Sequence, residues 1–366
     1  MNQQKKGNSN FHQIDHLELY VGNSFQAAHF YQKTLGFDII AYKDLTIDSK
    51  DRVSYLVQQG DIRLLLTSGV NPSSPIFHHV HVHGDGVKDI AFTTANAREA
   101  FESAVKAGAV PVQSPTIYQD ADGQLITAAL ATFGETIHTL VERQNGLETF
   151  FLPGYQPYNS LEENKTGIGL KMIDHLAICV NQGEMEKWCD FYKDTLGFYT
   201  SHKEDVFTAY SGMRSEVVRL DAEGLNFPII EPAPSKKQSQ IAEFLNFYQG
   251  AGVQHMAFLT EDIIQSVRTL KKRGITFLNI PDTYYEDLSD RVGPIEEKLH
   301  DLQELGILVD RDQHGYLLQI FSKPLQSRPT LFFEVIQRKG AVGFGSGNIR
   351  ALYQALEKEQ SLRGNL

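Results

Sequence analysis

The feature of this sequence that most limits its fold is an internal repeat. Residues 14–37 read IDHLELYVGNSFQAAHFYQKTLGF, and residues 173–198 read IDHLAICVNQGEMEKWCDFYKDTLGF. A second pair of similar segments follows, with VKDIAFTTANAREAFESAVKAGA at 87–109 and VQHMAFLTEDIIQSVRTLKKRGI at 253–275. Similar segments that recur in the same order indicate duplicated structural units. We therefore expect two halves that are structural duplicates, each built of two smaller units.

Each of the four units follows one pattern. A short apolar run with β character opens the unit, at 14–21, 87–93, 173–180 and 253–259. An amphipathic helix follows and ends at a glycine, the usual residue at helix ends: Gly36, Gly108, Gly197 and Gly274. Further strand-like runs come next, such as 53–57, 62–66, 215–220, 317–321 and 331–336. The pattern predicts βαβββ modules and an α+β fold.

We expect these four modules to form two domains. The first covers residues 1–147 and the second covers residues 171–366. A segment rich in proline, glycine and polar residues, 148–170, is the expected linker.

Composition excludes several classes of protein. The chain has 366 residues, 41% hydrophobic and 22% charged, which is typical of a globular protein long enough for two cores. A formal charge of −11 argues against a nucleic acid or an anionic membrane surface as partner. We find no apolar run of bilayer length and no secretory signal. Two cysteines that form no CxxC pair, Cys179 and Cys189, suit a reducing compartment, so we expect a cytoplasmic location.

The second half carries a candidate metal site. Its first strand contains His175, the opening strand of its next unit contains His255, and a late strand contains Glu334 between apolar residues. An inward-facing carboxylate needs a charge partner, because an unpaired buried charge is very costly. Two histidines and one carboxylate that face one cavity form the facial triad typical of non-haem iron(II).

The first half provides an internal control for this assignment. When the two halves are aligned, His16 matches His175, Asp89 matches His255 and Leu140 matches Glu334. The first half therefore lacks one imidazole and the carboxylate, and a lone imidazole cannot hold iron(II). We expect His16 to be structural and the first domain to be a scaffold.

At these positions the chain resembles a known family. The motifs that carry the resemblance span nearly the whole sequence: HGDGVKDIAF (83–92), ETIHTLVE (135–142), IDHLAICV (173–180), GAGVQHMAF (250–258), ELGILVDRD (304–312), LLQIFSKPLQSRPTLFFEVIQRKG (317–340) and GFGSGNI (343–349). They are similar to those of the 4-hydroxyphenylpyruvate dioxygenase family of the vicinal-oxygen-chelate superfamily, to which 4-hydroxymandelate synthase also belongs.

The resemblance implies a glyoxalase/bleomycin-resistance/dioxygenase-like fold with an open barrel around the metal in the second domain. It implies one iron(II) per chain at His175, His255 and Glu334, with dioxygen as co-substrate. The implied activity is that of a dioxygenase acting on a single donor, the 2-oxo acid 4-hydroxyphenylpyruvate. A small molecule is thus the expected partner, in a homodimeric enzyme of aromatic amino acid metabolism.

The resemblance also implies a set of residues around the substrate. Polar side chains are expected at Ser215, Gln240, Gln254, Gln319 and Asn348. Apolar and aromatic side chains are expected at Ile230, Phe321, Phe332, Phe344 and Ile349. A C-terminal helix at 347–361, with Ile349, Leu352, Tyr353 and Leu356 on one face, matches the lid that closes the pocket.

Two positions depart from the dioxygenase motifs and bear on the product. Residues 228–232 read PIIEP, where the dioxygenases have PINEP, and Gly347-Asn348-Ile349 replaces Gly-Asn-Phe. Isoleucine at both positions resembles hydroxymandelate synthases, and we expect 4-hydroxymandelate as product. Pro228, the run 233–237 and the ending 363–366 resemble dioxygenases of the animal type. Homogentisate, formed in tyrosine catabolism, is therefore the alternative product.

Other features of the sequence allow other interpretations. The histidines at 78, 79, 81 and 83 precede a turn, and we expect 79, 81 and 83 to share a strand face without a physiological metal. Tyr284 and Tyr285 are expected to be packing residues. A ligand-sequestering protein of the same fold and a zinc or nickel isomerase remain alternatives, although isomerases usually take four protein ligands.

Overall fold

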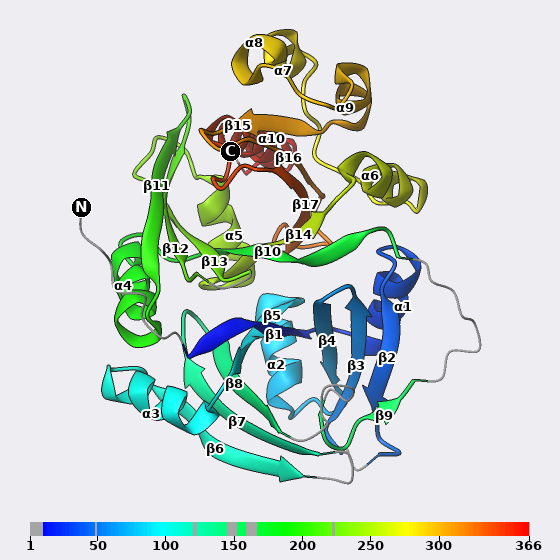
Figure 1. Cartoon of the computed structure of the whole chain (residues 1–366), viewed down its shortest axis with the longest axis vertical. Helices are drawn as coiled ribbons and strands as arrows, with labels where there is room; N and C mark the ends of the chain where they lie inside the picture. Colours follow the sequence, from blue (N-terminus) through cyan, green and yellow to red (C-terminus); the bar gives the residue numbers. More distant parts are fainter. Residues whose placement is uncertain are drawn as a thin grey trace.

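The computed structural model contains two large β-sheets stacked one above the other, with helices packed against them (Figure 1). It describes residues 10–47, 50–119, 123–144, 152–158, 167–221 and 224–365. Most of the expected linker lies outside the described residues. The division into domains at 147 and 171 therefore stays a prediction. Within the described ranges, no helix is long and apolar enough to cross a bilayer.

The first sheet has nine strands in the order β6-β7-β8-β5-β1-β4-β3-β2-β9. The strands are β1 Phe11–Tyr20, β2 Asp38–Lys43, β3 Arg52–Gln59, β4 Ile62–Gly69, β5 Gly86–Thr94, β6 Pro111–Gln119, β7 Gln124–Ala131, β8 Ile137–Gln144 and β9 Gln156–Pro157. The opening strands of the two modules, β1 and β5, pair antiparallel at the centre. Each of them pairs in parallel with the last strand of its own module, β4 or β8.

The second sheet repeats this topology with eight strands in the order β11-β12-β13-β10-β14-β17-β16-β15. The strands are β10 Leu170–Cys179, β11 Tyr199–Phe207, β12 Gly212–Arg219, β13 Asn226–Pro232, β14 Gly252–Thr260, β15 Leu308–Arg311, β16 Tyr316–Phe321 and β17 Phe332–Lys339. Again the opening strands, β10 and β14, pair antiparallel at the centre. The sheet curls around the C-terminal helix as an open barrel (Figure 1).

Helices follow the opening strands, as the repeat predicts. They are α1 Ser24–Lys33, α2 Pro75–His83, α3 Ala97–Lys106, α4 Met185–Leu196, α5 Gln240–Tyr248, α6 Ile263–Lys272, α7 Thr283–Glu286, α8 Leu288–Val292, α9 Leu299–Leu305 and α10 Ser346–Leu362. In α3, Ala100, Phe101 and Ala104 are buried on one face, and the Asn96 side chain accepts a hydrogen bond from the Glu99 amide at the start of the helix. The four βαβββ modules are thus confirmed.

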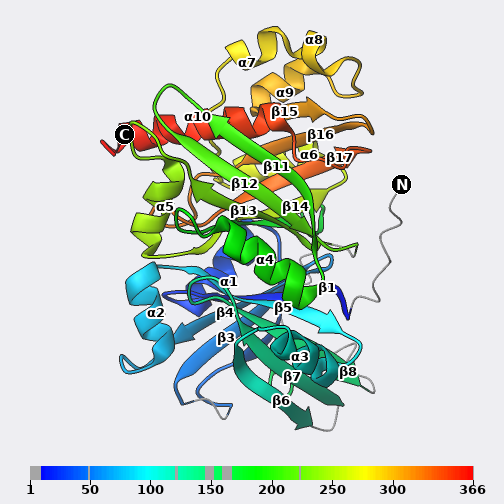
Figure 2. The same ribbon diagram turned by 90° about the vertical axis from the view of Figure 1, so that its left-hand side faces the viewer.

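An apolar core connects the two halves. The Phe37 and Phe258 rings lie 6.2 Å apart, and the Phe92 and Phe227 rings lie 6.1 Å apart. Figure 2 shows α4 of the second half next to the first half, where it contacts α3. The second half therefore packs on the first across a buried face, so each half supports the position of the other.

One predicted element is wrong. Residues 79–83 were expected in a strand, but they form the end of helix α2. The helix begins with Ser74, whose side chain accepts from the Ile76 amide, and with Pro75 in its first turn, which are standard helix-start signals. The cluster of β-branched and histidine residues masked these signals. As a result His79 and His83, four residues apart, share a helical face.

Candidate metal centre and adjoining cavity

Three adjacent strands bring the predicted metal ligands together. His175 on β10 pairs with Ala257 on β14, and Ala257 pairs with Glu334 on β17. His255 lies two residues before Ala257 on β14, so its side chain emerges on the same face of the sheet. His175 and Glu334 are 159 residues apart in the sequence. The repeat and the alternation of apolar residues were thus enough to predict that these side chains lie together.

The three donor atoms converge on one point. The Nε2 atom of His175 lies 3.2 Å from Glu334 Oε2, and the Nε2 atom of His255 lies 3.6 Å from the same oxygen. All three residues are at most 5% exposed. Two imidazole nitrogens and one carboxylate oxygen at this spacing suit a divalent transition metal, and three protein ligands leave positions open for small molecules. The residues present therefore fit iron(II).

A buried ion pair fixes the orientation of His175. Its Nδ1 atom lies 2.7 Å from Asp174 Oδ1, and because a carboxylate only accepts, Nδ1 carries a proton and Nε2 is the ring atom that faces Glu334. Arg338 holds Asp174 through two hydrogen bonds of 2.6 and 2.7 Å. Although burial acts to raise it, the pKa of Asp174 lies well below its ordinary value because Arg338 and His175 stabilise the carboxylate.

The two imidazoles of the candidate metal centre, His175 and His255, have opposite pKa shifts. Burial alone would lower the pKa of His175, but the charges of Glu334 and Asp174 raise it to about 9. Burial and repulsion from His175 lower the pKa of His255 well below its ordinary value. A single proton on His175 therefore takes the place of the metal charge between the carboxylates.

A chain of hydrogen bonds connects the carboxylate ligand to the C-terminal helix. Gln319 donates to Glu334 Oε1 at 2.8 Å and accepts from Asn348 at 2.8 Å. The Tyr284 hydroxyl lies 2.7 Å from Asn348 Oδ1. Tyr284 packs against the apolar core as expected, and its hydroxyl in addition completes this chain. The orientation of Glu334 is thus coupled to the position of α10.

A cavity opens beside the three ligands. Residues of the expected substrate shell that line it are Ser215, Ile230, Gln240, Gln254, Gln319, Phe321, Phe344 and Ile349. Gln254 donates to Gln240 at 2.9 Å, and the Phe344 ring lies 5.1 Å from the His175 ring. The predicted shell therefore gathers around one space, although its binding of substrate stays a prediction.

Two expected shell residues lie behind the cavity wall. Phe332 stacks on the His255 ring with ring centroids 4.9 Å apart, so it supports one of the predicted metal ligands. Asn348 is fully buried and bonds to Gln319 rather than facing the space. Neither residue is among those that line the cavity. Both act on the site through a neighbour.

The cavity also contains residues that sequence reasoning missed. Met213 and Val217 line it beside Ser215 on β12, and His202 on β11 lies at its margin. Residues 213, 215 and 217 alternate along one strand, so the period of two that placed Ser215 could have found its neighbours. No signal in the sequence indicated His202.

The two isoleucines that depart from the dioxygenase motifs meet in the cavity. Ile230 on β13 is 6% exposed and belongs to an apolar cluster with Met213 and Tyr353, and Ile349 on α10 packs against this cluster. Ser215 lies directly opposite Ile230 on the neighbouring strand. One apolar wall is thus formed by both isoleucines.

In the first half, the position equivalent to Glu334 lies one residue before the one that the sequence alignment gave. His16 pairs with Ala91, and the β5–β8 register sets Phe92 opposite Leu140, so Thr139 lies opposite Ala91. Thr139, and not Leu140, therefore corresponds to Glu334. The Thr139 amide and hydroxyl both donate to Asp89. Among the described residues of the first half, no metal-sized cluster forms around His16.

Known proteins are similar to this chain over nearly its whole length. Residues 13–127 and 172–320 match the Glyoxalase/Bleomycin resistance protein/Dioxygenase superfamily. The chain is 40% identical to a 4-hydroxyphenylpyruvate dioxygenase of Yarrowia lipolytica, over 96% of this chain and 93% of that protein. It is 42% identical to the Xenopus tropicalis enzyme of the same name, over 99% and 95%.

Solved structures of proteins from the same family are also similar to this chain. A mutant of 4-hydroxymandelate synthase from Streptomyces coelicolor superposes with a TM-score of 0.85 at 35% identity, covering 96% of this chain and 99% of that one. A fusion protein that contains a 4-hydroxyphenylpyruvate dioxygenase superposes with a TM-score of 0.74 at 27% identity, covering 98% of this chain and 54% of that one.

Proposed function

Because this chain belongs to the 4-hydroxyphenylpyruvate dioxygenase family of the Glyoxalase/Bleomycin resistance protein/Dioxygenase superfamily, we propose that it converts 4-hydroxyphenylpyruvate and dioxygen into 4-hydroxymandelate and carbon dioxide. It is a non-haem iron dioxygenase. The observation that carries the proposal is the buried cluster of His175, His255 and Glu334, which opens on a cavity walled by two isoleucines.

In this proposal the three ligands hold one iron(II) ion. Bound iron supplies open positions at which a 2-oxo acid and dioxygen can meet. The Asp174–Arg338 pair holds the His175 ring so that its lone pair faces the metal position. Gln319 holds Glu334 in the same way through one carboxylate oxygen, which leaves the other oxygen to face the imidazoles.

The cavity orients the substrate and excludes water. Gln254 and Gln240, joined by a hydrogen bond, and Ser215 present polar groups to an otherwise apolar space. These few polar groups can fix the orientation of an aromatic substrate whose ring packs on the apolar walls. We propose that α10 is the lid, because Leu352 and Tyr353 on its inner face close the cavity.

The isoleucines favour one of two products. Oxygen delivered to the ring carbon that bears the side chain leads to side-chain migration and homogentisate. Oxygen delivered to the neighbouring benzylic carbon leads to 4-hydroxymandelate. These targets are one bond apart, so ring placement decides between them. An aliphatic side chain at 349 and an apolar one at 230 give the ring room to turn, and they remove a hydrogen-bonding group from the wall.

Homogentisate is the second candidate product. The curated relatives that are 40–42% identical to this chain, from fungi and vertebrates, are named as dioxygenases. Both candidates share the substrate and the iron site, and they differ only in where the ring lies. A homodimer and a cytoplasmic location complete the proposal, and both stay predictions.

Product chromatography tests the proposed function. Protein loaded anaerobically with iron(II) is mixed with 4-hydroxyphenylpyruvate and air, and the products are separated beside standards of 4-hydroxymandelate and homogentisate. We expect 4-hydroxymandelate, with one dioxygen consumed for each carbon dioxide released. Homogentisate as the sole product would contradict the assignment of the product and leave the iron site intact. Binding of the substrate without dioxygen uptake would contradict the enzymatic function.

A further inference from the structure

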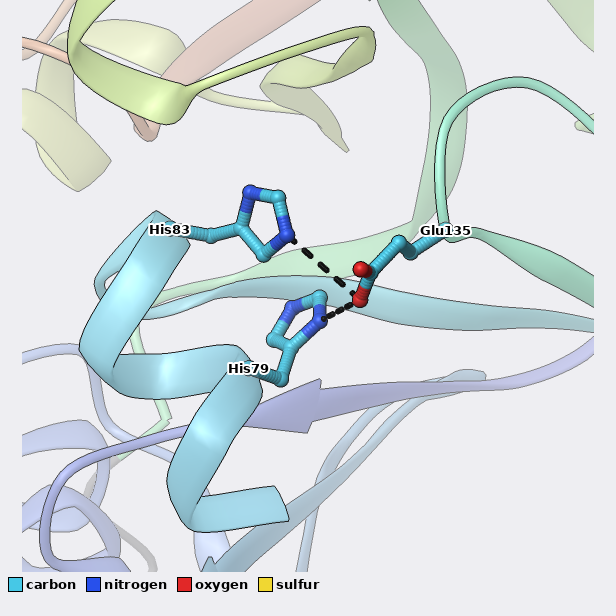
Figure 3. Close-up of side chains that lie close together, drawn as sticks. All are labelled: His79, His83 and Glu135. Atoms are coloured by element: carbon cyan, nitrogen blue, oxygen red, sulfur yellow. Dashed lines mark hydrogen bonds and ion pairs between the residues drawn. The ribbon is translucent and has the colours of Figure 1, made fainter. Parts of the chain in front are cut away.

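A second cluster of possible metal ligands lies far from the iron site along the chain. His79 and His83 project from one face of α2, and Glu135 reaches them from the turn between β7 and β8 (Figure 3). The other histidines of this helix, His78 and His81, are exposed and take no part in the cluster. The helical spacing of four residues is what brings the two imidazoles to the same side.

The spacing of this cluster resembles that of the iron ligands. Glu135 Oε2 lies 2.8 Å from His79 Nδ1 and 3.4 Å from His83 Nε2. The corresponding distances from Glu334 to its two histidines are 3.2 and 3.6 Å. Donor atoms a little over 3 Å apart are what a tetrahedral ion with ligands at about 2.0–2.1 Å requires.

The surroundings orient His83 as they orient a metal ligand. Its Nδ1 atom bonds to the backbone carbonyl of Tyr248, at the end of α5, so Nδ1 carries the proton. The Nε2 atom of His83 is therefore the ring atom that faces Glu135 and that can bind a metal (Figure 3). A backbone carbonyl that fixes the tautomer of a histidine in this way is the usual support of a metal-bound imidazole.

Hydrogen bonds alone leave this cluster incompletely satisfied. His79 and His83 are 3% and 4% exposed, and in the described part of the chain the Nε2 atom of His83, which faces Glu135, is buried without a hydrogen-bond partner. Buried polar atoms are nearly always paired, and an exception calls for a missing ion or water. The Lys88 ammonium bonds to the backbone carbonyl of Glu135, which leaves the carboxylate to the imidazoles.

We propose that His79, His83 and Glu135 form a second metal site, for a divalent ion of the zinc class with water as its fourth ligand. Two imidazoles and one carboxylate are suitable ligands for such an ion. The Glu135 side chain is 51% exposed, so the ion can reach the buried imidazoles from the solvent side.

The position of this site suggests its role. It joins α2 of the first half to the β7–β8 turn, and His83 contacts Tyr248, the last residue of α5. The first residue of α5 is Gln240, which lines the substrate cavity. The ion would thus brace the contact between the two halves on which a cavity helix rests, as a structural zinc does elsewhere.

Zinc stoichiometry tests the proposal. Because zinc would also enter the iron site, the full-length Glu334→Ala protein serves as background, and zinc per chain is measured by elemental analysis after equilibrium dialysis. We expect one zinc per chain in this background and none after Glu135→Gln is added. His81→Gln, on the exposed side of the same helix, should leave the single zinc in place.

Thermal unfolding provides the second readout. Zinc should raise the melting temperature of the Glu334→Ala protein but not that of Glu334→Ala/Glu135→Gln, because only an ion bound to the folded state stabilises it. Glu135 is half exposed, so the substitution leaves the core intact. An absence of zinc in the Glu334→Ala background would overturn the proposal. So would a zinc that Glu135→Gln does not remove, since it would be bound elsewhere in the chain.

Discussion

The two halves of this protein share a fold, but only the second half contains the predicted iron site. In each half an aspartate on the first strand bonds to the next histidine at 2.7 Å, in the pairs Asp15–His16 and Asp174–His175. In each half an arginine on the last strand bonds to that aspartate, through Arg143 or Arg338. The aspartate–arginine support of the histidine is therefore present twice, whereas the complete set of predicted iron ligands is present once among the described residues.

This difference separates what the fold needs from what the metal needs. The aspartate–arginine pair joins the first and last strands of a half-sheet whether or not a metal follows, so it is structural in both halves. In the first half Asp89 replaces one imidazole and Thr139 replaces the carboxylate, and these two residues bond to each other. Two substitutions thus convert a metal site into a hydrogen-bonded pair without exposing an unpaired charge.

The largest expected effect is the difference in activity between variants of His175 and variants of its first-half equivalent, His16. His175→Ala or Glu334→Ala should abolish turnover, because each removes one of only three protein ligands. His16→Ala should keep most of the activity, since no cluster of metal ligands forms around His16 among the described residues. Initial rates of dioxygen uptake with 4-hydroxyphenylpyruvate measure the difference. If His16→Ala were as inactive as His175→Ala, the view of the first half as a scaffold would be wrong.

A change of product is the next effect in size. Ile349→Phe should move the ring and shift part of the product toward homogentisate, and adding Ile230→Asn should shift it further. A difference of about 1.4 kcal/mol between the competing barriers changes the ratio tenfold, so mixtures are expected. The two residues share one wall, and their effects need not add. An unchanged product ratio in the double variant would remove these residues from product choice.

The lid should have a several-fold effect on yield. Truncation before Ser346 removes α10 and the Asn348 contact to Gln319, so water enters the site. We expect carbon dioxide release to continue while hydroxylated product falls several-fold. The matched control removes only residues 364–366. Equal product yields in the two truncated proteins would exclude a lid function, and circular dichroism checks that both remain folded.

The smallest effect concerns stability in the first half. Burial raises the pKa of Asp89 to about 6, above the ordinary value of 3.8. Because the folded state favours protonated Asp89, its contribution to the free energy of unfolding is complete below pH 3.8. This contribution is lost as the pH rises through about 6. Asp89→Asn cannot ionise, so relative to wild type it should gain up to roughly 3 kcal/mol in unfolding free energy between pH 4 and pH 7.

Urea unfolding at several pH values measures this difference, and Asp15→Asn is the control of opposite sign. Burial acts to raise the pKa of Asp15, but His16 and Arg143 lower it overall, so its stabilising contribution is present at neutral pH and is lost only in acid. Asp15→Asn should therefore be less stable than wild type at pH 7. A pH-independent gap between Asp89→Asn and wild type would show that Asp89 is not the titrating group.

The repeat made most of the fold and the metal ligands predictable, because each assignment could be checked against a second copy. The errors have local causes. The Leu140 match failed by one residue because neither Thr139 nor Leu140 has a carboxylate that would mark the position, and only the strand register identifies Thr139. The role of Tyr284 depends on a contact with Asn348, 64 residues away, which no local pattern encodes.

An anomalous scattering map at the iron absorption edge tests the central claim most directly. Crystals of the protein loaded anaerobically with iron(II) should give a strong peak within bonding distance of His175 Nε2, His255 Nε2 and Glu334. They should give no peak between His16 and Asp89. A peak of comparable strength at the first-half position, or none at the second-half position, would contradict the assignment of the iron chemistry to the second half alone.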